Sequence, residues 1–85
     1  MKYLIQGGES AARFDLLISL TKLGENAVSA LRDHLVVGLD DSTAASLNGL
    51  NKSNFSRALA TLNTAAETVE KIKEIDWSHL NKSTK

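Results

Sequence analysis

The segment DSTAASLNGLNKSNFSRALATL, residues Asp41 to Leu62, decides how this chain folds. It meets three requirements of two short helices that cross at a tight turn. Ala45 is small enough for a second helix to press against it, and Gly49, four positions later, tolerates the positive φ of the turn. Six positions further on, Phe55 supplies the apolar plug that returns the second helix to the core, and Leu50 adds another core contact. The spacing therefore predicts a helix-turn-helix over residues 41–62.

Most residues of the second helix around Phe55 are expected to point outward. They are of the types that bond phosphates and base edges in DNA, namely Lys52, Ser53, Asn54, Ser56 and Arg57. A purely structural helix pair explains the spacing equally well, because any helical hairpin needs a small residue and a turn glycine. The spacing alone therefore leaves a DNA reader and a structural hairpin both open.

The two basic residues of this segment have distinct candidate roles. Lys52 lies near the N-terminus of the second helix, where backbone N–H groups also favour a phosphate. Arg57 lies one turn further along, where it can reach a guanine edge with two hydrogen bonds, and Asn54 can pair with an adenine edge. Ordinary solvated surface charges are the competing interpretation of Lys52 and Arg57.

Hydroxyl and amide side chains complete the candidate interface. Ser53 and Ser56 are expected to bond phosphates rather than bases. Thr43 is a candidate anchor between the first helix of the pair and the DNA backbone. Asn51 is expected mainly to cap the second helix, with DNA contact as a secondary role.

Length and composition point to one small domain that spans residues 1–85. The chain has no cysteine, which excludes a disulfide framework and a thiolate zinc site. A chain of this size has little core of its own, so self-association is expected to add stability. No apolar run approaches the roughly 20 residues of a membrane span, and the start MKYLIQGGES is too weak for a signal peptide. We expect a cytoplasmic protein with no membrane partner.

The charges balance overall but are unevenly distributed. Ten basic and ten acidic residues cancel, which counts against a DNA binder, since such proteins are usually basic. Between Ser42 and Ala66, however, the chain has two basic residues, Lys52 and Arg57, and no acidic one. A local basic spot between acidic flanks fits a weak or multimeric DNA binder whose affinity is summed over subunits.

The first half of the chain contains two predicted helices, and the absence of proline favours helices throughout. Residues 1–9 are interpreted as an arm or short extended segment that ends in Gly7-Gly8. Ser10 is expected to cap a helix over Ala11–Lys22, which Gly24 would end. Its apolar residues lie on more than one side, so we expect burial by two partners, the domain core and a second subunit. A second helix is predicted over Glu25–Val37.

The second half contains the helix-turn-helix and a long last helix. Asp40 or Asp41 is expected to cap a helix over Ser42–Asn48. The last helix begins near Lys52 and has apolar residues at a heptad spacing, Phe55, Leu62 and Val69 in one row and Ala58, Ala65 and Ile72 in the other. Its first turns are predicted to read DNA and the remainder to pack, on the body or on another subunit. In the tail, Trp77 and Leu80 are expected to dock on the body, and residues 78–85 to fray.

No grouping of residues suggests catalysis or a bound cofactor. His34 and His79 are far apart in sequence and have no partner at metal-ligand spacing, and His34 is expected to border the core or an interface. The chain shows no nucleophile with an adjacent base, no phosphate loop and no carboxylate pair. We therefore predict neither an enzyme nor a metal, cofactor or small-molecule site.

Two segments carry a resemblance to a known family. They are ALRDHLVVG, residues Ala30–Gly38, and LNKSNFSRAL, residues Leu50–Leu59, and the stretch between them fits without a gap. With the upstream YLIQGG and FDLLISL, they resemble the PapB-like regulators of adhesin (fimbrial) gene expression in enterobacteria. The resemblance covers roughly Tyr3 to Leu62. The helix-turn-helix part is also similar to the TrfB/KorA-type plasmid repressors.

The resemblance implies a bacterial transcription regulator that self-associates and binds double-stranded operator DNA, on the nucleoid when bound. Its recognition helix would correspond here to Asn51, Lys52, Ser53, Asn54, Ser56 and Arg57, with Phe55 as the core plug. The predicted fold is all-α, with four to five helices, a helix-turn-helix and a long C-terminal helix. The competing function is a protein-interaction module, antitoxin-like or adaptor-like, that does not bind DNA directly.

Overall fold

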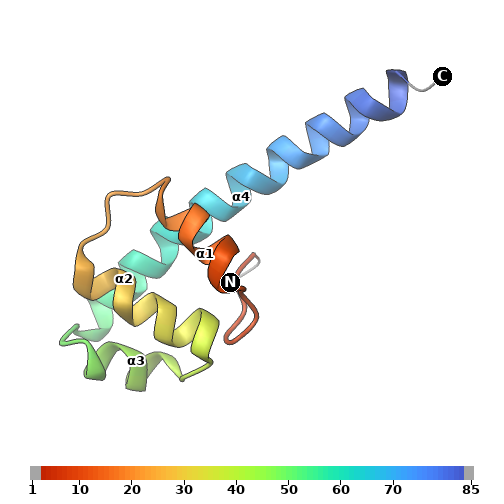
Figure 1. Cartoon of the computed structure of the whole chain (residues 1–85). Helices are drawn as coiled ribbons and strands as arrows, with labels where there is room; N and C mark the ends of the chain where they lie inside the picture. The colour runs from red at the N-terminus through yellow and green to blue at the C-terminus, as the bar shows by residue number, and fades with distance from the viewer. Residues whose placement is uncertain (1–2, 84–85) are drawn as a thin grey trace.

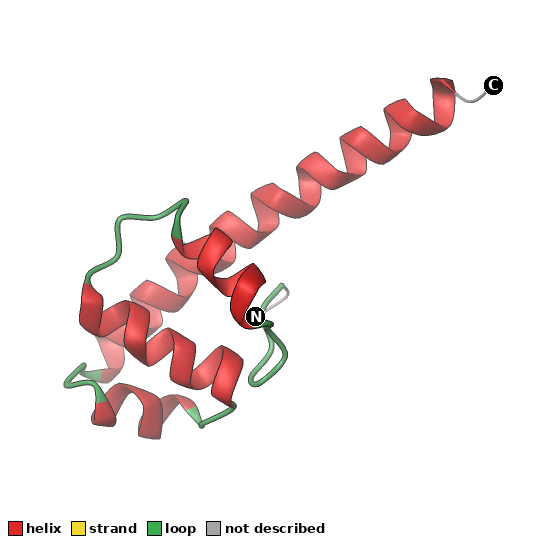
Figure 2. Cartoon of the chain, in the orientation of Figure 1, coloured by secondary structure: helices red, strands yellow, loops and turns green. Residues whose placement is uncertain are grey.

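The chain forms a small helical body from which one long helix projects (Figure 1). The computed structural model describes the backbone of residues 3–83 and the side chains of residues 3–79. Within those residues the regular structure is entirely helical (Figure 2), so the predicted all-α fold is confirmed. In chain order the elements are α1 (Ala11–Ile18), α2 (Glu25–Arg32), the π-helical turn η1 (Asp33–Val37), α3 (Asp41–Leu47) and α4 (Lys52–Ser83).

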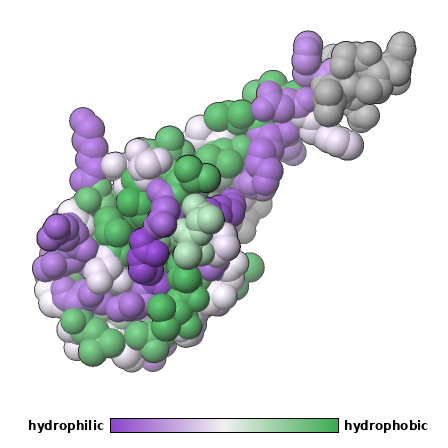
Figure 3. Space-filling model, viewed as in Figure 1, coloured by the Kyte–Doolittle hydropathy of each residue, from purple (hydrophilic) through white to green (hydrophobic). Residues whose placement is uncertain are grey.

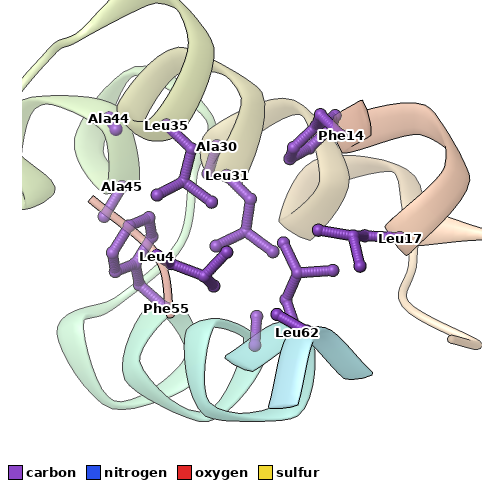
Figure 4. Close-up of a cluster of buried hydrophobic side chains, with 12 residues drawn as sticks. Leu4, Phe14, Leu17, Ala30, Leu31, Leu35, Ala44, Ala45, Phe55 and Leu62 are labelled. Carbon is purple, nitrogen blue, oxygen red and sulfur yellow. The ribbon is translucent and has the colours of Figure 1, made fainter. Parts of the chain in front are cut away.

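The core lies where α1, α2 and α3 pack around the first half of α4 (Figure 4). It is built of leucine, alanine and phenylalanine: Leu4, Phe14, Leu17, Ala30, Leu31, Leu35, Ala44, Ala45, Phe55, Ala58, Leu62 and Ala66. The residues from α4 recur every three or four positions, which places them on one side of the helix. The first part of the predicted heptad pattern therefore packs inside the domain rather than on another subunit.

Helix α1 is shorter than predicted. It begins after the expected Ser10 cap, whose side chain accepts a hydrogen bond from the Arg13 N–H, but it ends at Ile18 instead of Lys22. Two hydroxyls close its last turn: Ser19 Oγ donates to the Leu16 carbonyl over 2.5 Å, and Thr21 Oγ1 donates to the Ile18 carbonyl over 2.8 Å. Such bonds offer the backbone an alternative to helix. The prediction that Gly24 ends this helix is also wrong, because Gly24 is the N-cap of α2.

The N-terminal arm docks on the end of the second predicted helix. Leu4 is buried in the core. The N–H groups of Gly7 and Glu9 donate, each over 3.0 Å, to the carbonyls of His34 and Leu35. These carbonyls lie in the π-helical turn at the C-terminal end of the helix, where carbonyl groups lack partners within the helix. The arm thus supplies donors to two carbonyls of that helix end.

The second half of α4 leaves the body. Every described side chain from Lys71 to His79 is exposed, and Trp77 is 65% exposed. The expected docking of Trp77 is therefore wrong, and the Leu80 side chain lies outside the described residues. Fraying from residue 78 onward is also wrong as far as Ser83, because α4 continues to that residue; residues 84–85 lie outside the described part. No helix within residues 3–83 has the length and apolar character needed to cross a membrane.

Candidate nucleic-acid interface

The turn between α3 and α4 has the geometry that the sequence predicts. Gly49 has a φ of +70°, and α3 ends in two hydrogen bonds, from the Leu50 N–H to the Ala45 carbonyl and from the Gly49 N–H to the Ser46 carbonyl. This pair of bonds is the Schellman motif, which satisfies carbonyls left free at a helix end. Ala45 and Phe55 are both buried, and Leu50 packs against the core. The fold thus contains two helices, α3 and α4, that are joined by a short turn at Gly49.

Replacing Gly49 by alanine is expected to lower the free energy of unfolding by about 1–2 kcal/mol, the usual penalty of left-handed backbone for a residue with a Cβ. No atom lies within 4 Å of the added Cβ, so backbone strain alone causes the loss. Gly24→Ala is the matched control, because its Cβ is equally free and its φ of −73° is ordinary. Urea denaturation of both variants measures the difference. Equal stability of the two variants would contradict the strain argument.

Each helix of the pair begins with a side-chain cap. Asp40 Oδ1 accepts the Thr43 N–H over 2.8 Å at the start of α3, and Asn51 Oδ1 accepts the Asn54 N–H over 2.8 Å at the start of α4. Of the two aspartates expected at the first position, Asp40 is the cap. Hydrogen bonds from the side chain and then the backbone of Thr43 hold the pKa of Asp40 below its ordinary value of 3.8.

This cap makes a small part of the stability pH-dependent. Because the folded-state pKa of Asp40 is depressed, the ionised cap stabilises the fold above pH 3.8 and loses that contribution as the pH falls through the lower folded-state pKa. The difference in free energy of unfolding between the wild type and Asp40→Ala is therefore expected to shrink below pH 3.8. Denaturation at a series of acidic pH values measures it. A difference that stays constant down to pH 2 would contradict this assignment.

The predicted contact residues of α4 gather on its first two turns. Lys52, Ser53, Asn54, Ser56 and Arg57 are all exposed, and the structure places them around the buried Phe55. Asn51 is exposed and serves as the cap. Thr43 is exposed on α3 and uses its backbone N–H for the other cap. All the predicted contact residues of the helix pair are therefore accessible to an external partner.

The basic residues among these predicted contacts differ from most others in the described part of the chain. Arg13 pairs with Glu9 and Glu70, Arg32 pairs with Asp15, and Lys71 and Lys73 pair with acids one turn away on α4. Among the lysines and arginines of residues 3–79, those without a carboxylate partner are Lys22, Lys52 and Arg57. Two of these three lie on the first two turns of α4, with their charges available to an external anion.

A shallow groove separates α3 from the start of α4. Its lining comprises Asp41, Ser42, Ala45 and Ser46 from α3, Leu50 from the turn, and Lys52 and Phe55 from α4. The lining thus carries one negative charge, from Asp41, and one positive charge, from Lys52. The two serines were not singled out from the sequence. They lie four residues apart, on the side of α3 away from the buried Ala44. Their helical spacing alone could therefore have indicated that they share an exposed face.

Comparison with protein families shows which family this chain belongs to. Residues 1–75 match the family PapB, described as "Adhesin biosynthesis transcription regulatory protein". This chain belongs to the PapB family. No curated protein matches it significantly. The resemblance inferred from residues 30–38 and 50–59 is thereby confirmed.

The fold of this PapB-family chain also matches a solved structure. The crystal structure of FocB from E. coli superposes with a TM-score of 0.80, at 24% sequence identity, over 86% of this chain and 84% of that chain. At this identity the likeness concerns the fold alone. The match covers most of both chains, so the helical body is not peculiar to this sequence.

A hydrogen bond between side chains ties the helix pair to the rest of the body in this PapB-family chain. Asn48 Nδ2 donates to Asp33 Oδ2 over 2.9 Å and to the Ala44 carbonyl over 2.8 Å. The first bond joins the end of α3 to η1. Sequence reasoning missed this tie, because the two residues are fifteen positions apart and nothing local indicates that they meet.

Proposed function

We propose that this PapB-family protein regulates adhesin gene expression by binding operator DNA through α3 and the first two turns of α4. The observation that supports it best is the pair of unpartnered cations, Lys52 and Arg57, on a capped and exposed helix start. A helix N-terminus favours phosphate, and two free cations add charge attraction at the same place. The family is one of transcription regulators, which supports a role for this surface in regulation.

The two cations divide the work in this proposal. Lys52, in the first turn of α4, holds a phosphate and positions the domain without regard to sequence. Arg57 and Asn54, on the exposed surface, read base edges, and Ser53 and Ser56 bond phosphates on either side. Thr43 anchors α3 to the DNA backbone. Asp40 and Asp41 add negative charge near Thr43 at the start of α3, so we expect α4 to supply most of the contacts to DNA.

Arg57→Ala is expected to weaken operator binding by about 1–3 kcal/mol while leaving binding to unrelated DNA nearly unchanged. Gel-shift titration on the DNA upstream of the protein's own gene measures both. Lys22→Ala is the matched control, because Lys22 is also exposed and unpaired but lies in the loop between α1 and α2. Unchanged operator affinity of a folded Arg57→Ala variant would refute the assignment of Arg57.

Lys52→Ala is expected to weaken binding to every DNA sequence alike and to reduce the slope of log affinity against log salt by about one unit per subunit. The same titrations at several salt concentrations measure the slope. A variant that loses affinity only for the operator would show that Lys52 reads bases rather than phosphates.

We also propose that the protein acts as a dimer or a larger assembly. Lys52 and Arg57 by themselves would give weak binding at physiological salt, and linked subunits would strengthen it. Large apolar side chains remain exposed on α1 and the loop after it, at Leu16 and Leu20, and on the projecting part of α4, at Ile72 and Ile75. Figure 3 shows hydrophobic residues at the surface of the body and of α4. Association through these residues would bury them.

The same exposed residues favour the competing function, a protein-interaction module that does not contact DNA. The balance of ten basic and ten acidic residues fits that function too. The titrations described for Arg57 and Lys52 distinguish the two. A folded wild-type chain with no DNA affinity even at low salt would support the interaction module and refute direct DNA binding.

A further inference from the structure

His34 lies in η1 and contacts both the loop that leads into α3 and the first turns of α4. The residue is half-buried. Its Nδ1 lies 2.8 Å from the carbonyl oxygen of Leu39, in the loop that leads into α3. A carbonyl oxygen only accepts hydrogen bonds, so Nδ1 carries the proton and donates. The same ring meets the Phe55 ring edge to face, with centroids 5.5 Å apart and planes at 83°.

The contact with Phe55 bears directly on the candidate DNA surface. Phe55 is 2% exposed, and its neighbours Asn54 and Ser56 are exposed candidate contacts. Because the three residues share one helical backbone, a rotation of α4 about its axis that shifts Phe55 in its pocket turns these neighbours by the same angle. An edge-to-face contact between rings has a preferred geometry, unlike an aliphatic contact. The ring of His34 is thus placed to define the rotation of the first turns of α4.

The hydrogen bond to Leu39 acts on the other helix of the pair. Leu39 directly precedes Asp40, the N-cap of α3. The Leu39 N–H donates to the Asp33 carbonyl over 2.9 Å, so this residue is held to η1 through both its N–H and its carbonyl. The bond from His34 therefore contributes to where α3 begins, whereas the ring contact contributes to how α4 is turned.

We propose that His34 is a positioning residue for DNA discrimination, whose ring contact with Phe55 sets the rotation of the base-reading turns of α4. This inference rests on the proposed function. Base contacts need their donors placed within about 0.5 Å, whereas phosphate contacts to a flexible lysine tolerate larger shifts. Loss of the ring contact therefore reduces the preference for the operator and leaves general DNA affinity nearly intact.

Two substitutions separate the two contacts of His34. His34→Asn keeps a donor at the position of Nδ1 and removes the ring. His34→Phe keeps the ring against Phe55 and removes the donor. Leu17→Val is the control for destabilisation alone, because Leu17 is buried in α1 and is not part of the helix pair. Each variant is measured for thermal stability, and for affinity toward the operator and toward unrelated DNA, well below its melting temperature.

The expected results differ in direction. His34→Asn loses about tenfold of its operator preference, the order of one impaired base contact, and binds unrelated DNA like the wild type. His34→Phe melts at a lower temperature, because the Leu39 carbonyl loses its donor, and keeps the preference. Residual dipolar couplings of backbone N–H groups, measured without DNA, show that the first turns of α4 are rotated about the helix axis in His34→Asn only.

Three outcomes would overturn the proposal. In the first, Leu17→Val loses as much operator preference as His34→Asn. In the second, His34→Asn keeps the wild-type preference. In the third, its dipolar couplings match those of the wild type. A wild-type chain without operator preference would refute the proposed function instead. The couplings would then still decide whether His34 sets the rotation of the first turns of α4, and an unchanged rotation would overturn that part as well.

Discussion

Replacing Phe55 by alanine is expected to lower the free energy of unfolding by about 3–5 kcal/mol. Phe55 is 2% exposed and lies at the meeting point of α3, η1 and α4, where its ring contacts His34. Truncation removes a buried ring and leaves a cavity that the short helices around it can fill only in part. Native proteins are stable by about 5–15 kcal/mol in total. A domain this small is expected near the lower end of that range, where the loss would leave the variant partly unfolded at 25 °C.

Chemical denaturation followed by far-ultraviolet circular dichroism measures this loss. Leu47→Ala is the control, because Leu47 lies on α3 of the same helix pair but is 68% exposed. An exposed leucine is expected to change stability by less than about 0.5 kcal/mol. Equal stability of the Phe55→Ala variant and the wild type would contradict the assignment of Phe55 as the core plug and would suggest a stacking role on an outside partner.

Replacing Ile72 and Ile75 together by glutamate is expected to dissociate the proposed assembly and to weaken operator binding by about 10²–10⁴-fold, the usual gain from linked sites. The two side chains are 52% and 67% exposed on the projecting part of α4 and lie one turn apart. Burying isoleucine against a second copy stabilises the contact, whereas buried glutamates without partners oppose it. Monomers would then each hold DNA with only two cations.

Sedimentation equilibrium and gel-shift titration of the same samples measure both effects. The control is Lys73→Gln with Ser78→Glu, which lowers the net charge by the same two units on the same stretch of α4 and keeps both isoleucines. Its assembly is expected to persist. A wild-type chain that is monomeric at micromolar concentration and still binds operator DNA tightly would contradict the need for self-association.

Local features of the sequence were enough to predict the helix pair. Gly49 was assigned to a turn with positive φ, and it has a φ of +70°. Asn51 was assigned to the cap of α4 and accepts the Asn54 N–H. Phe55 was assigned to the core and is buried. The turn and the cap depend on residues within a few positions along the chain, so the short sequence window contains their physical cause. The burial of Phe55 also requires η1 and α3 to pack against it.

The apolar pattern of the sequence does not contain the length of the first helix or the surroundings of the last one. The first depends on local hydroxyl bonds and the second on contacts between distant residues. The predicted extension of the first helix to Lys22 failed because the hydroxyls of Ser19 and Thr21 turn back onto its last carbonyls. The heptad spacing of apolar residues in α4 continues unchanged from Leu62 to Ile72. Only the positions of α1 and α2 decide that Leu62 is buried and that Ile72 is exposed.

The sequence by itself determined the helical class, the caps and the turn, because these follow from backbone preferences and from bonds between near neighbours. Only the tertiary structure decided which charges are free. Arg32 finds Asp15 across seventeen residues and Arg13 reaches Glu70 on α4, whereas Lys52 and Arg57 meet no carboxylate among the described residues. A salt bridge depends on the distance in space between two opposite charges. Folding sets that distance, and the separation of the residues along the sequence does not.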